Sequence, residues 1–525
     1  MTWTDDGDVI DLAGFLKSIY PGFLVRDEPL VGNQEVNLDV PEYSQTPDEE
    51  KVEFGGVSGP VVLTKDGQIR GLTLDKAHVF YGVPYAGPPT GAYRWKSPRP
   101  VNPWSGVYDA TSPRAALPIK HKFKTFKLFI KFNTFLVSED CLYLNVFVPL
   151  DVNLTVPLWT HLPVLVWIHG GDFIAGSASK PLYDGRFLSN FTHTVVVSMD
   201  YRLGAFGFLV SGKDPLTSAV GNYGILDQQA ALLWVQRNIA VFGGDPGKVT
   251  IFGESAGAQS VSLHLMMQSS APLFRQAVLQ SLPFSIPLKT RSGPSHKAVY
   301  LWTLGQCFRS TALVQDRFNI ILLLLFFLNV LQATRLLTKA RLNPIVEVYS
   351  RFIPGRVLVS MMGYKLSVCS LRLPQIVTDY IFLCPARHSA RSGVASGSHV
   401  WMYVFDHVTS DHRVWSGLSF CYQHVCHGAE LPFVFNSAQV ANVSMTPAER
   451  LLSNRMLCYW GAWAHTGDPS ARAGQTGFCR EQRLPLWPRY SDTSGWLLMN
   501  LTVRSHAQVG TREHICDFWD KLGIY

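Results

Sequence analysis

The sequence predicts an α/β fold with a mostly parallel central sheet, helices on both faces and an antiparallel edge at the N-terminal side. Two apolar runs, at residues 162–168 and 194–200, have the composition of strands that are buried on both faces. A helical pattern follows at 226–238, and a further apolar strand at 249–252 comes after it. This alternation of strand and helix favours right-handed crossovers and therefore a parallel sheet.

The antiparallel edge is predicted from the chain that precedes these strands. Residues 1–50 are acidic and weakly patterned, so we expect an N-terminal extension there rather than a folded layer. Beyond them, short alternating runs at 61–63, 67–73 and 79–85 are separated by glycines, which is typical of an antiparallel meander. We therefore expect a single domain over residues 51–525.

Composition and charge exclude some classes of function. The chain of 525 residues is 47% hydrophobic and 16% charged, which suffices for a large core. Its formal net charge is +7, but the basic run at 120–131 is interleaved with phenylalanine and is typical of a solvated amphipathic segment, so nucleic-acid binding has little support. The nine-residue apolar run at 320–328 falls short of the roughly 18 residues that span a bilayer, and we expect a buried helix or strand.

Two conflicting signals leave the compartment open. Four Asn-x-Ser/Thr glycosylation acceptors suggest a secreted or extracellular protein. They begin at Asn153, Asn190, Asn442 and Asn500. The acidic N-terminus, however, lacks the basic and then apolar segments by which a signal peptide is recognised.

The cysteines do not indicate a metal site. There are nine of them, so at least one is unpaired, and none shows the spacing of a metal finger. Cys421 and Cys426 are too few to form a metal cage, and they fit either a disulfide or two plain thiols.

The candidate nucleophile is Ser255, in the sequence Gly253-Glu-Ser-Ala-Gly257. This Gly-x-Ser-x-Gly pattern directly follows the apolar strand at 249–252. A strand that turns sharply into a helix brings backbone against backbone, which favours glycine on each side and leaves the serine hydroxyl at the tip of the turn. The amides at the start of the helix would stabilise an anion formed there. The alternative is an ordinary glycine-rich turn, and the flanking motifs decide between the two.

Ordered motifs on both sides of Ser255 are similar to those of one family. They lie at residues 80–91, 139–146, 169–173, 200–208, 221–228, 242–246, 377–385, 427–435 and 459–469. On these motifs the chain resembles the type-B carboxylesterase and cholinesterase-like family of α/β-hydrolases. The resemblance implies the α/β-hydrolase fold, a small-molecule carboxylic ester as substrate, and no metal or organic cofactor.

The resemblance also assigns roles to residues of this chain. His427 begins a His-Gly-Ala-Glu sequence that is similar to the segment carrying the family's catalytic histidine, and it follows Ser255 in the order expected of this fold. We expect His427 to be the general base that activates the serine. The oxyanion hole is expected from the backbone amides of Gly170, Gly171 and Ala256.

Several neighbouring residues have other interpretations. His424 competes with His427 as the base, but it is more typical of a histidine on a loop. His169 is expected to be structural. Glu254 either lines the floor of the active-site gorge, as the resemblance implies, or is a buried carboxylate satisfied by backbone amides. Buried scaffold charges that pair with one another are expected at Asp200, Arg202 and Asp227.

The acid of the catalytic triad is not assigned. The family places it, usually as a glutamate, in a loop between the serine and the histidine, but residues 290–343 do not match that pattern. Glu347 has a workable position in the sequence, yet residues 345–349 are typical of a later helix. Without an orienting carboxylate a catalytic histidine holds the wrong tautomer, which can cost about 10⁴ in turnover.

Residues 117–137 depart from the family as well. Relatives usually carry a cysteine in place of Leu117, paired with the counterpart of Cys141, so the resemblance leaves Cys141 without its partner. Cholinesterases also hold a quaternary ammonium group against a tryptophan of this loop. Residues 117–141 contain no tryptophan, so choline ester specificity is unsupported. Both divergent stretches are either genuine or translated non-coding sequence.

Two classes of function follow from these features. The first is a serine carboxylic ester hydrolase that acts through an acyl-enzyme, which the presence of Ser255 favours. The second is a cholinesterase-like adhesion or scaffold protein that has kept the fold and lost activity, which the unassigned acid favours. A lipase acting at membranes would need an apolar lid, for which 320–328 is the one hint. The sequence gives no firm membrane signal and does not indicate an oligomeric state.

Overall fold

The computed structural model of this chain describes residues 57–114, 138–156, 161–212, 214, 216–283, 375, 378–415, 417–473, 475–510 and 512–522. The predicted N-terminal extension, the divergent stretches at 117–137 and 290–343, and Glu347 lie outside the described residues. The extent of the single domain, 51–525, also stays a prediction.

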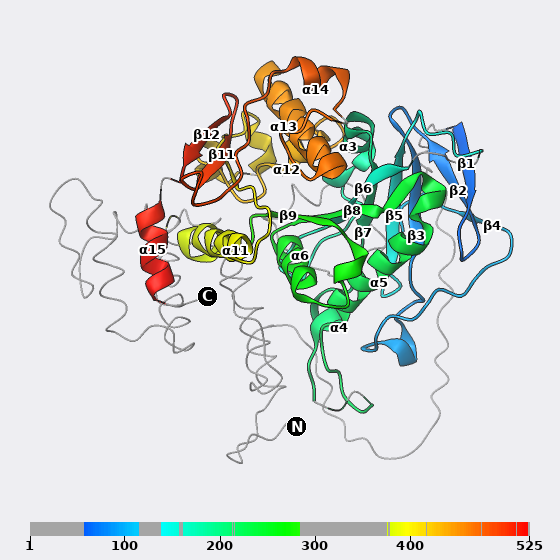
Figure 1. The fold of residues 1–525 in the computed structure, drawn as a ribbon. Coiled ribbons are helices and arrows are strands. Elements are labelled where there is room, and N and C mark those ends of the chain that lie inside the picture. The colour runs from blue at the N-terminus through cyan, green and yellow to red at the C-terminus, as the bar shows by residue number, and fades with distance from the viewer. Residues whose placement is uncertain are drawn as a thin grey trace, which may run out of the picture. The chain divides into compact units, whose positions relative to one another are not determined.

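Nine strands of the described residues form one central sheet (Figure 1). They are β1 (Val57–Leu63), β2 (Gln68–Thr73), β3 (Ala77–Pro84), β4 (Val107–Asp109), β5 (Tyr143–Pro149), β6 (Leu162–Ile168), β7 (Val195–Met199), β8 (Gly244–Glu254) and β9 (Gln276–Gln280). Their order across the sheet is β1-β2-β3-β5-β7-β6-β8-β9, with β4 paired to β2.

The sheet is parallel in its centre and antiparallel at its N-terminal edge. β6 pairs in parallel with β7 on one side and with β8 on the other, and β8 pairs in parallel with β9. β1, β2, β3 and β5 form an antiparallel series, which joins the parallel part through the antiparallel pair β5 and β7. Parallel neighbours need a crossover connection, usually a helix that lies on a face of the sheet. The predicted fold class is confirmed.

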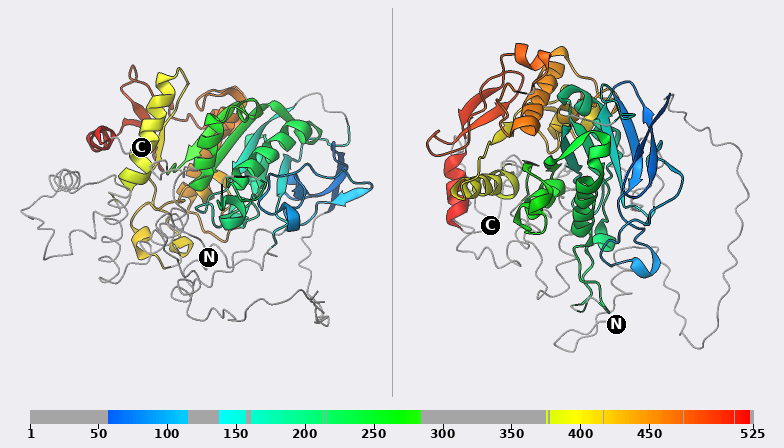
Figure 2. Two further views of the ribbon diagram at one scale, coloured as in Figure 1. Left: turned by 90° about the horizontal axis from the view of Figure 1, so that it is seen from below. Right: turned by 45° about the vertical axis from the view of Figure 1, so that its right-hand side comes forward.

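Both faces of the central strands are buried. In β6, Val164, Val166 and Ile168 belong to one apolar cluster, whereas Leu165 and Trp167 belong to the cluster on the opposite face. Helices lie on both faces of the sheet (Figure 2). The first cluster includes residues of α5 (Tyr223–Asn238) and α6 (Ala256–Met266), and the second includes residues of α3 (Gly185–Thr192), α12 (Leu431–Phe435) and α13 (Pro447–Thr466).

The other elements complete the described chain. The longer ones are α4 (Gly204–Phe208), the π-helix η6 (Thr378–Leu383), α11 (Cys384–Ala395), α14 (Gly477–Glu481), α15 (Glu513–Lys521) and a three-stranded sheet of β10 (Tyr403–Phe405), β11 (Leu497–Leu501) and β12 (His506–Val509). Single 3₁₀ turns are η1 (Gly91–Tyr93), η3 (Pro181–Tyr183), η4 (Ile239–Phe242), η5 (Ala271–Leu273), η7 (His412–Trp415) and η8 (Ser419–Tyr422). No helix in the described residues is long and apolar enough to cross a lipid bilayer.

Two disulfides join helices, across sequence separations of 132 and 21 residues. Cys384 and Cys516 link α11 to α15, and Cys458 and Cys479 link α13 to α14. Cys141 is a fully buried free thiol, as expected from the absence of its usual partner.

The glycosylation acceptors differ in their exposure to solvent. Asn153, Asn190 and Asn442 are exposed, whereas Asn500 lies in β11 and is 6% exposed. The Asn500 amide donates hydrogen bonds to Asp406 and Gln508. The folded chain therefore presents three of its four acceptors to solvent, and a glycan on Asn500 would disrupt β11.

A buried ion pair ties the end of β7 to α5. Nε and Nη2 of Arg202 donate to the two carboxylate oxygens of Asp227, each at 2.7 Å, and both side chains are at most 2% exposed. This contact confirms the prediction for these two residues. Asp200 is also buried, but its Oδ1 accepts a hydrogen bond from the amide of Ala178 at 2.8 Å. Burial raises the pKa of Asp200 to about 7, so near neutral pH it carries less charge than an ordinary aspartate.

Asp227→Asn is expected to destabilise the fold by about 3–5 kcal/mol, because the Arg202 charge would stay buried without its counter-ion. Urea unfolding followed by tryptophan fluorescence measures this loss. Glu139→Gln is the matched control, because Arg94 and Glu139 are 37% and 25% exposed and water screens their attraction. An equal loss for the two variants would contradict the structural role of the buried pair.

Candidate active site

Ser255 occupies a strained backbone corner between β8 and α6. β8 ends at Glu254 and α6 begins at Ala256, so the strand turns into the helix at a single residue. Ser255 has φ 60° and ψ −122°, a conformation that a non-glycine residue rarely adopts. Such a conformation costs of order 1–3 kcal/mol and persists only where the surroundings impose it. The predicted arrangement of strand, serine and helix is therefore present, and the serine is 7% exposed.

Two glycines allow this corner to pack against β6. A Cβ atom on Gly257 would lie 2.0 Å from the carbonyl oxygen of Ile168, the last residue of β6. A Cβ atom on Gly253 would lie 2.6 Å from the carbonyl carbon of Gly257. Both distances are far below van der Waals contact, so the backbone of the corner fits only without side chains at these positions.

The loop after β6 lies against the same corner. A Cβ atom on Gly170 would lie 3.0 Å from Cβ of Ser255, so the Gly170 backbone is adjacent to the serine side chain. Within the described residues, the amides of Gly170 and Gly171 donate no hydrogen bond. The Ala256 amide, at the first position of α6, has no partner inside the helix. Unpaired amides of the loop and of the helix thus flank Ser255.

His169 holds this loop rather than facing a ligand. Its ring is fully buried and stacks on Tyr201, with 4.6 Å between the ring centroids. The hydroxyl of Tyr201 donates to the His169 carbonyl at 2.7 Å. Burial lowers the pKa of His169 to about 3, so the ring is neutral. These contacts agree with the structural role expected of His169.

His427 lies beside the residue that precedes the serine. Its Nε2 is 2.9 Å from Oε1 of Glu254, and its ring packs at 4.9 Å from the ring of Phe382 in η6. Desolvation by the surrounding protein opposes the imidazolium charge, but the Glu254 carboxylate, helped by Glu430 and Asp172, raises the pKa of His427 to about 9. At neutral pH the ring is therefore a cation paired with Glu254.

This pairing decides how the imidazole faces the nucleophile. Nε2, the ring nitrogen that could accept a proton from the serine, makes an ion-pair contact of 2.9 Å with Oε1 of Glu254, and Oγ of Ser255 has no hydrogen-bond partner among the described residues. Glu254 is 5% exposed, and its Oε1 accepts no hydrogen bond from a backbone amide in the described part of the chain, so backbone amides do not satisfy this oxygen. The fold places His427 next to the corner, and its imidazole ring is protonated there at neutral pH.

Sequence reasoning missed two further residues of this group. Glu430 is 4% exposed, and its Oε1 accepts a hydrogen bond from Nε2 of Gln280 at 3.1 Å. Burial first, and then the neighbouring charge of Glu254, raise the pKa of Glu430 to about 7. Gln280 also accepts the Ser255 amide hydrogen through its carbonyl oxygen at 3.0 Å. Glu430 lies three residues after His427, and this proximity in the sequence could have indicated that it belongs to the group. Nothing in the sequence indicated that Gln280 does.

His424, the competing histidine, has local contacts. Its ring stacks on that of Phe420 with 4.2 Å between centroids, and its Nδ1 lies 3.0 Å from the Phe420 carbonyl oxygen. Both residues belong to an exposed part of the loop before His427. The interpretation of His424 as an ordinary loop histidine fits these contacts.

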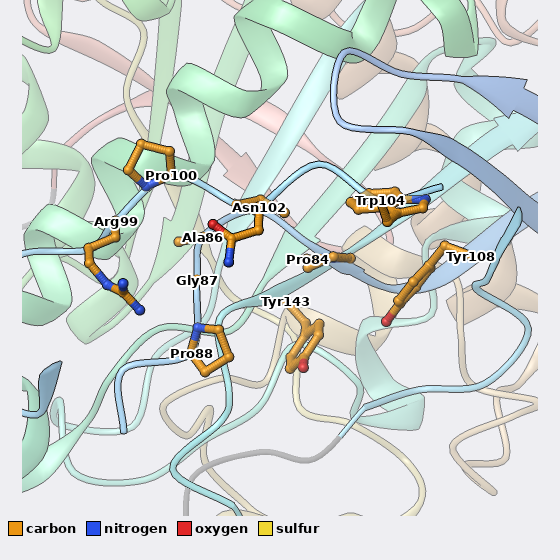
Figure 3. A pocket seen from close by; sticks show the side chains of 11 residues that line it. Pro84, Ala86, Gly87, Pro88, Arg99, Pro100, Asn102, Trp104, Tyr108 and Tyr143 are labelled. Carbon is orange, nitrogen blue, oxygen red and sulfur yellow. The ribbon is translucent and has the colours of Figure 1, made fainter. Parts of the chain in front are cut away.

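A separate hollow lies at the N-terminal edge of the sheet (Figure 3). Its volume is about 280 Å³. It is lined by Pro84, Ala86, Gly87, Pro88, Arg99, Pro100, Val101, Asn102, Trp104, Tyr108 and Tyr143. None of these residues belongs to the group around Ser255 and His427, so the candidate active site is built on that group. No set of three or more His, Cys, Asp or Glu side chains in the described chain is arranged to hold a metal ion.

Comparison with known proteins assigns the chain to a family. The model described as "Carboxylesterase family" matches residues 58–342 and 367–519. The chain belongs to the carboxylesterase family. This family assignment supports ester hydrolysis as its general activity. The unmatched residues 343–366 include Glu347, so the match does not support that residue as the triad acid.

Curated relatives in the carboxylesterase family cover nearly all of the chain. Acetylcholinesterase of Bungarus fasciatus is 33% identical over 540 residues, which is 87% of this chain and 86% of the relative. Cholinesterase of Mus musculus is 32% identical over 545 residues, with 87% and 86% covered. Crystal protein of Dictyostelium discoideum is 32% identical over 527 residues, with 88% and 90% covered. Two of these names state an esterase activity and the third states none.

Gly257→Ala is expected to destabilise the protein by about 1–3 kcal/mol or more, because the added methyl group would meet the Ile168 carbonyl at 2.0 Å. Gly477→Ala is the control, because a Cβ atom on Gly477 has no atom within 4 Å. Thermal unfolding by calorimetry compares the two. If Gly257→Ala melted at the temperature of the control, the close packing of the corner against β6 would be refuted.

Proposed function

We propose that this protein is a serine hydrolase that cleaves carboxylic esters through an acyl-enzyme. The observation that carries the proposal is the strained corner at Ser255, flanked by unpaired amides of Gly170, Gly171 and Ala256. Backbone strain at one residue is costly, and it is typical of sites where a side chain must be presented to a ligand. Amides without partners suit the oxyanion that forms when a serine attacks an ester carbonyl.

The proposed reaction assigns one step to each group. Oγ of Ser255 attacks the ester carbonyl while Nε2 of His427 takes its proton. The three amides hold the oxyanion, and each such donor is worth about 3 kcal/mol of transition-state stabilisation. His427 then gives the proton to the departing alcohol, and water hydrolyses the acyl-enzyme by the same route. No metal or organic cofactor takes part in this scheme.

His427 has to change its state before it can act as the base. An imidazolium has no free lone pair, so the ring must lose its proton and its Nε2 must turn from Glu254 toward Ser255. Glu254 and Ser255 are consecutive residues, so both groups that the ring would contact belong to the same corner. Glu254 thus favours the cation at neutral pH, and the active base becomes populated as the pH approaches the raised pKa of His427, about 9.

The substrate is proposed as a carboxylic ester without further specification. Two relatives are named acetylcholinesterase and cholinesterase. Residues 117–141 of this chain contain no tryptophan to hold a quaternary ammonium group, so choline is not part of the proposal.

A catalytically impaired scaffold or adhesion protein is the second candidate. One observation favours it: Nε2 of His427 pairs with Glu254, and within the described residues no carboxylate contacts its Nδ1. The triad acid remains unassigned, and an unoriented histidine is a poor base.

Labelling with a fluorophosphonate probe separates the two candidates. The probe forms a covalent bond to an activated serine, so the proposal predicts a stoichiometric adduct on the peptide that contains Ser255, identified by mass spectrometry. Ser255→Ala is the control and should take up no probe while keeping the same melting temperature. Folded wild-type protein that takes up no probe at pH 7 to 9.5 would establish the scaffold candidate instead.

The pH dependence of the reaction tests the pairing of His427 with Glu254. Since the pKa of His427 is raised to about 9, kcat/KM should climb with rising pH until about pH 9. Glu254→Gln removes the carboxylate and should move this rise toward the ordinary histidine pKa of 6.5. Hydrolysis of a neutral aryl ester, corrected for the spontaneous rate, gives the profile.

The control for this profile is Glu481→Gln, because Glu481 lies on the exposed helix α14. In Glu481→Gln, kcat/KM should rise over the same pH range as in the wild type. A rise that stays near pH 9 in Glu254→Gln would show that Glu254 does not set the titration of the base, whatever the absolute rate of that variant.

A further inference from the structure

The loop that leads into His427 is closed by a disulfide. Cys421 and Cys426 are bonded to each other across a sequence separation of five, and Cys426 directly precedes His427. Cys421 is 6% exposed, and Cys426 is half-buried. The remaining elements of this loop are two single turns, η7 and η8. Such short turns have little stability of their own, so the covalent link is the strongest local restraint.

The buried residues of this loop form a small apolar cluster of their own. Trp415, Cys421 and Ala429 form a small buried cluster that is distinct from the two clusters on the faces of the central sheet. The amide of Ala429 donates to the carbonyl oxygen of Cys426 at 3.0 Å, which closes a turn around His427. The disulfide therefore belongs to the cluster and also begins the turn that carries the imidazole.

The chain on the other side of His427 is anchored differently. α12 begins at Leu431, and its residues Phe433, Val434 and Phe435 are fully buried in the second core cluster. Gly428, between His427 and α12, has φ 82°, so the chain bends sharply there. His427 thus stands between a helix that the core holds and a loop that the disulfide holds.

We propose that the Cys421–Cys426 disulfide is a positioning element, which holds the His427 imidazole against Glu254 at the serine corner. Other groups surround the ring at its position beside the serine corner, whereas the disulfide restrains the loop that carries the ring. Glu254 comes from the end of β8, and Glu430 from the turn before α12. Asp172 comes from the loop after β6, and Phe382 from η6.

Loss of the disulfide should therefore act on His427 in a specific way. An open loop samples many conformations, and the contact of 2.9 Å between Nε2 and Oε1 is then present for part of the time. A weaker contact with Glu254 stabilises the imidazolium less, so the pKa of His427 falls from about 9 toward 6.5. The effect on turnover rests on the proposed function, whereas the effect on the titration of His427 does not.

The test compares two disulfide pairs in the full-length chain. Cys421→Ala/Cys426→Ala removes the proposed positioning element and keeps its small cluster apolar. Cys458→Ala/Cys479→Ala removes a disulfide between α13 and α14 and serves as the matched control. Diethyl pyrocarbonate modifies neutral imidazole, so short pulses at a series of pH values, read by peptide mass spectrometry, give the titration of His427. Reactivity of His161, an exposed histidine outside this loop, serves as the reference in the same samples.

The expected result is a midpoint near pH 9 in the wild type and in the control pair, and a midpoint at least one pH unit lower in Cys421→Ala/Cys426→Ala. Glu254→Gln provides the size of the full shift. An unchanged midpoint in Cys421→Ala/Cys426→Ala overturns the proposal. An equal shift in both disulfide variants overturns it as well, because it would reflect general loosening of the fold.

A second measurement tests the proposal even if Cys421→Ala/Cys426→Ala does not fold. Folded wild-type protein is treated with a water-soluble phosphine. The disulfide oxidises the phosphine as the S–S bond breaks, water supplies the oxygen atom of the phosphine oxide, and the two sulfur atoms become thiols. Mass spectrometry of alkylated samples selects the conditions in which Cys421 and Cys426 are the pair reduced. The same drop in the His427 midpoint is expected, and its absence refutes positioning.

Kinetics separate this inference from the proposed function. With enzyme concentration set by fluorophosphonate titration, Cys421→Ala/Cys426→Ala should lower kcat at pH 9.5 at least tenfold with little change in KM, because the base would be in place beside the serine for only part of the time. The control pair should keep the wild-type kcat. If the wild type takes up no probe, the hydrolase proposal fails while the titration of His427 still decides the role of the disulfide.

Discussion

The backbone corner at Ser255 is the constraint on which the rest of the site depends. A serine at φ 60° is unfavourable, and the packing of Gly257 against the end of β6 holds it there. The corner exists because β8 lies next to β6 in a parallel pair, which aligns the carboxyl ends of both strands. The amides of Gly170 and Gly171 follow β6, and the amide of Ala256 follows β8. One pairing of strands therefore places the proposed nucleophile and the amides together.

Charge adjacent to this corner is concentrated in a poorly solvated space. Glu254 and Glu430 are both nearly buried, and the pKa of Glu430 rises to about 7, first because burial disfavours its charged form and then because the Glu254 charge lies beside it. His427 supplies the cation that compensates Glu254. The same attraction that stabilises this arrangement also protonates the proposed base. The interaction that stabilises the site without substrate therefore works against the neutral form of His427 that the proposed reaction needs. Perturbed pKa values of this kind are common at sites built from buried ionisable groups.

Segments that lie far apart in the sequence meet at this group. Ser255 and Glu254 come from the central sheet, whereas His427 and Glu430 come from a loop near residue 430 that has its own small cluster and disulfide. α12 connects that loop to the core on the face of the sheet opposite α6. The core fixes one end of the loop firmly and the disulfide fixes the other, so the histidine is held by two independent restraints.

The sequence by itself determined the parts of this protein that are encoded by neighbouring residues. Apolar runs predicted β6, β7 and β8, because a strand buried on both faces needs an apolar side chain at nearly every position. The Gly-x-Ser-x-Gly pattern predicted the corner, because the steric demand lies within five residues. Motif order supplied the family, and the family supplied His427. The paired charges of Arg202 and Asp227 were also predictable from that resemblance.

Only the tertiary structure decided the contacts between distant segments. The pairing of His427 with Glu254, the contact of Gln280 with Glu430, and the choice of a disulfide over two thiols at Cys421 all depend on how loops are placed against the sheet. No local pattern encodes such distances, because the residues are separated by many positions and their side chains are compatible with several partners. The raised pKa of His427 follows from the same placement, since a charge acts on a neighbour through space and not along the sequence.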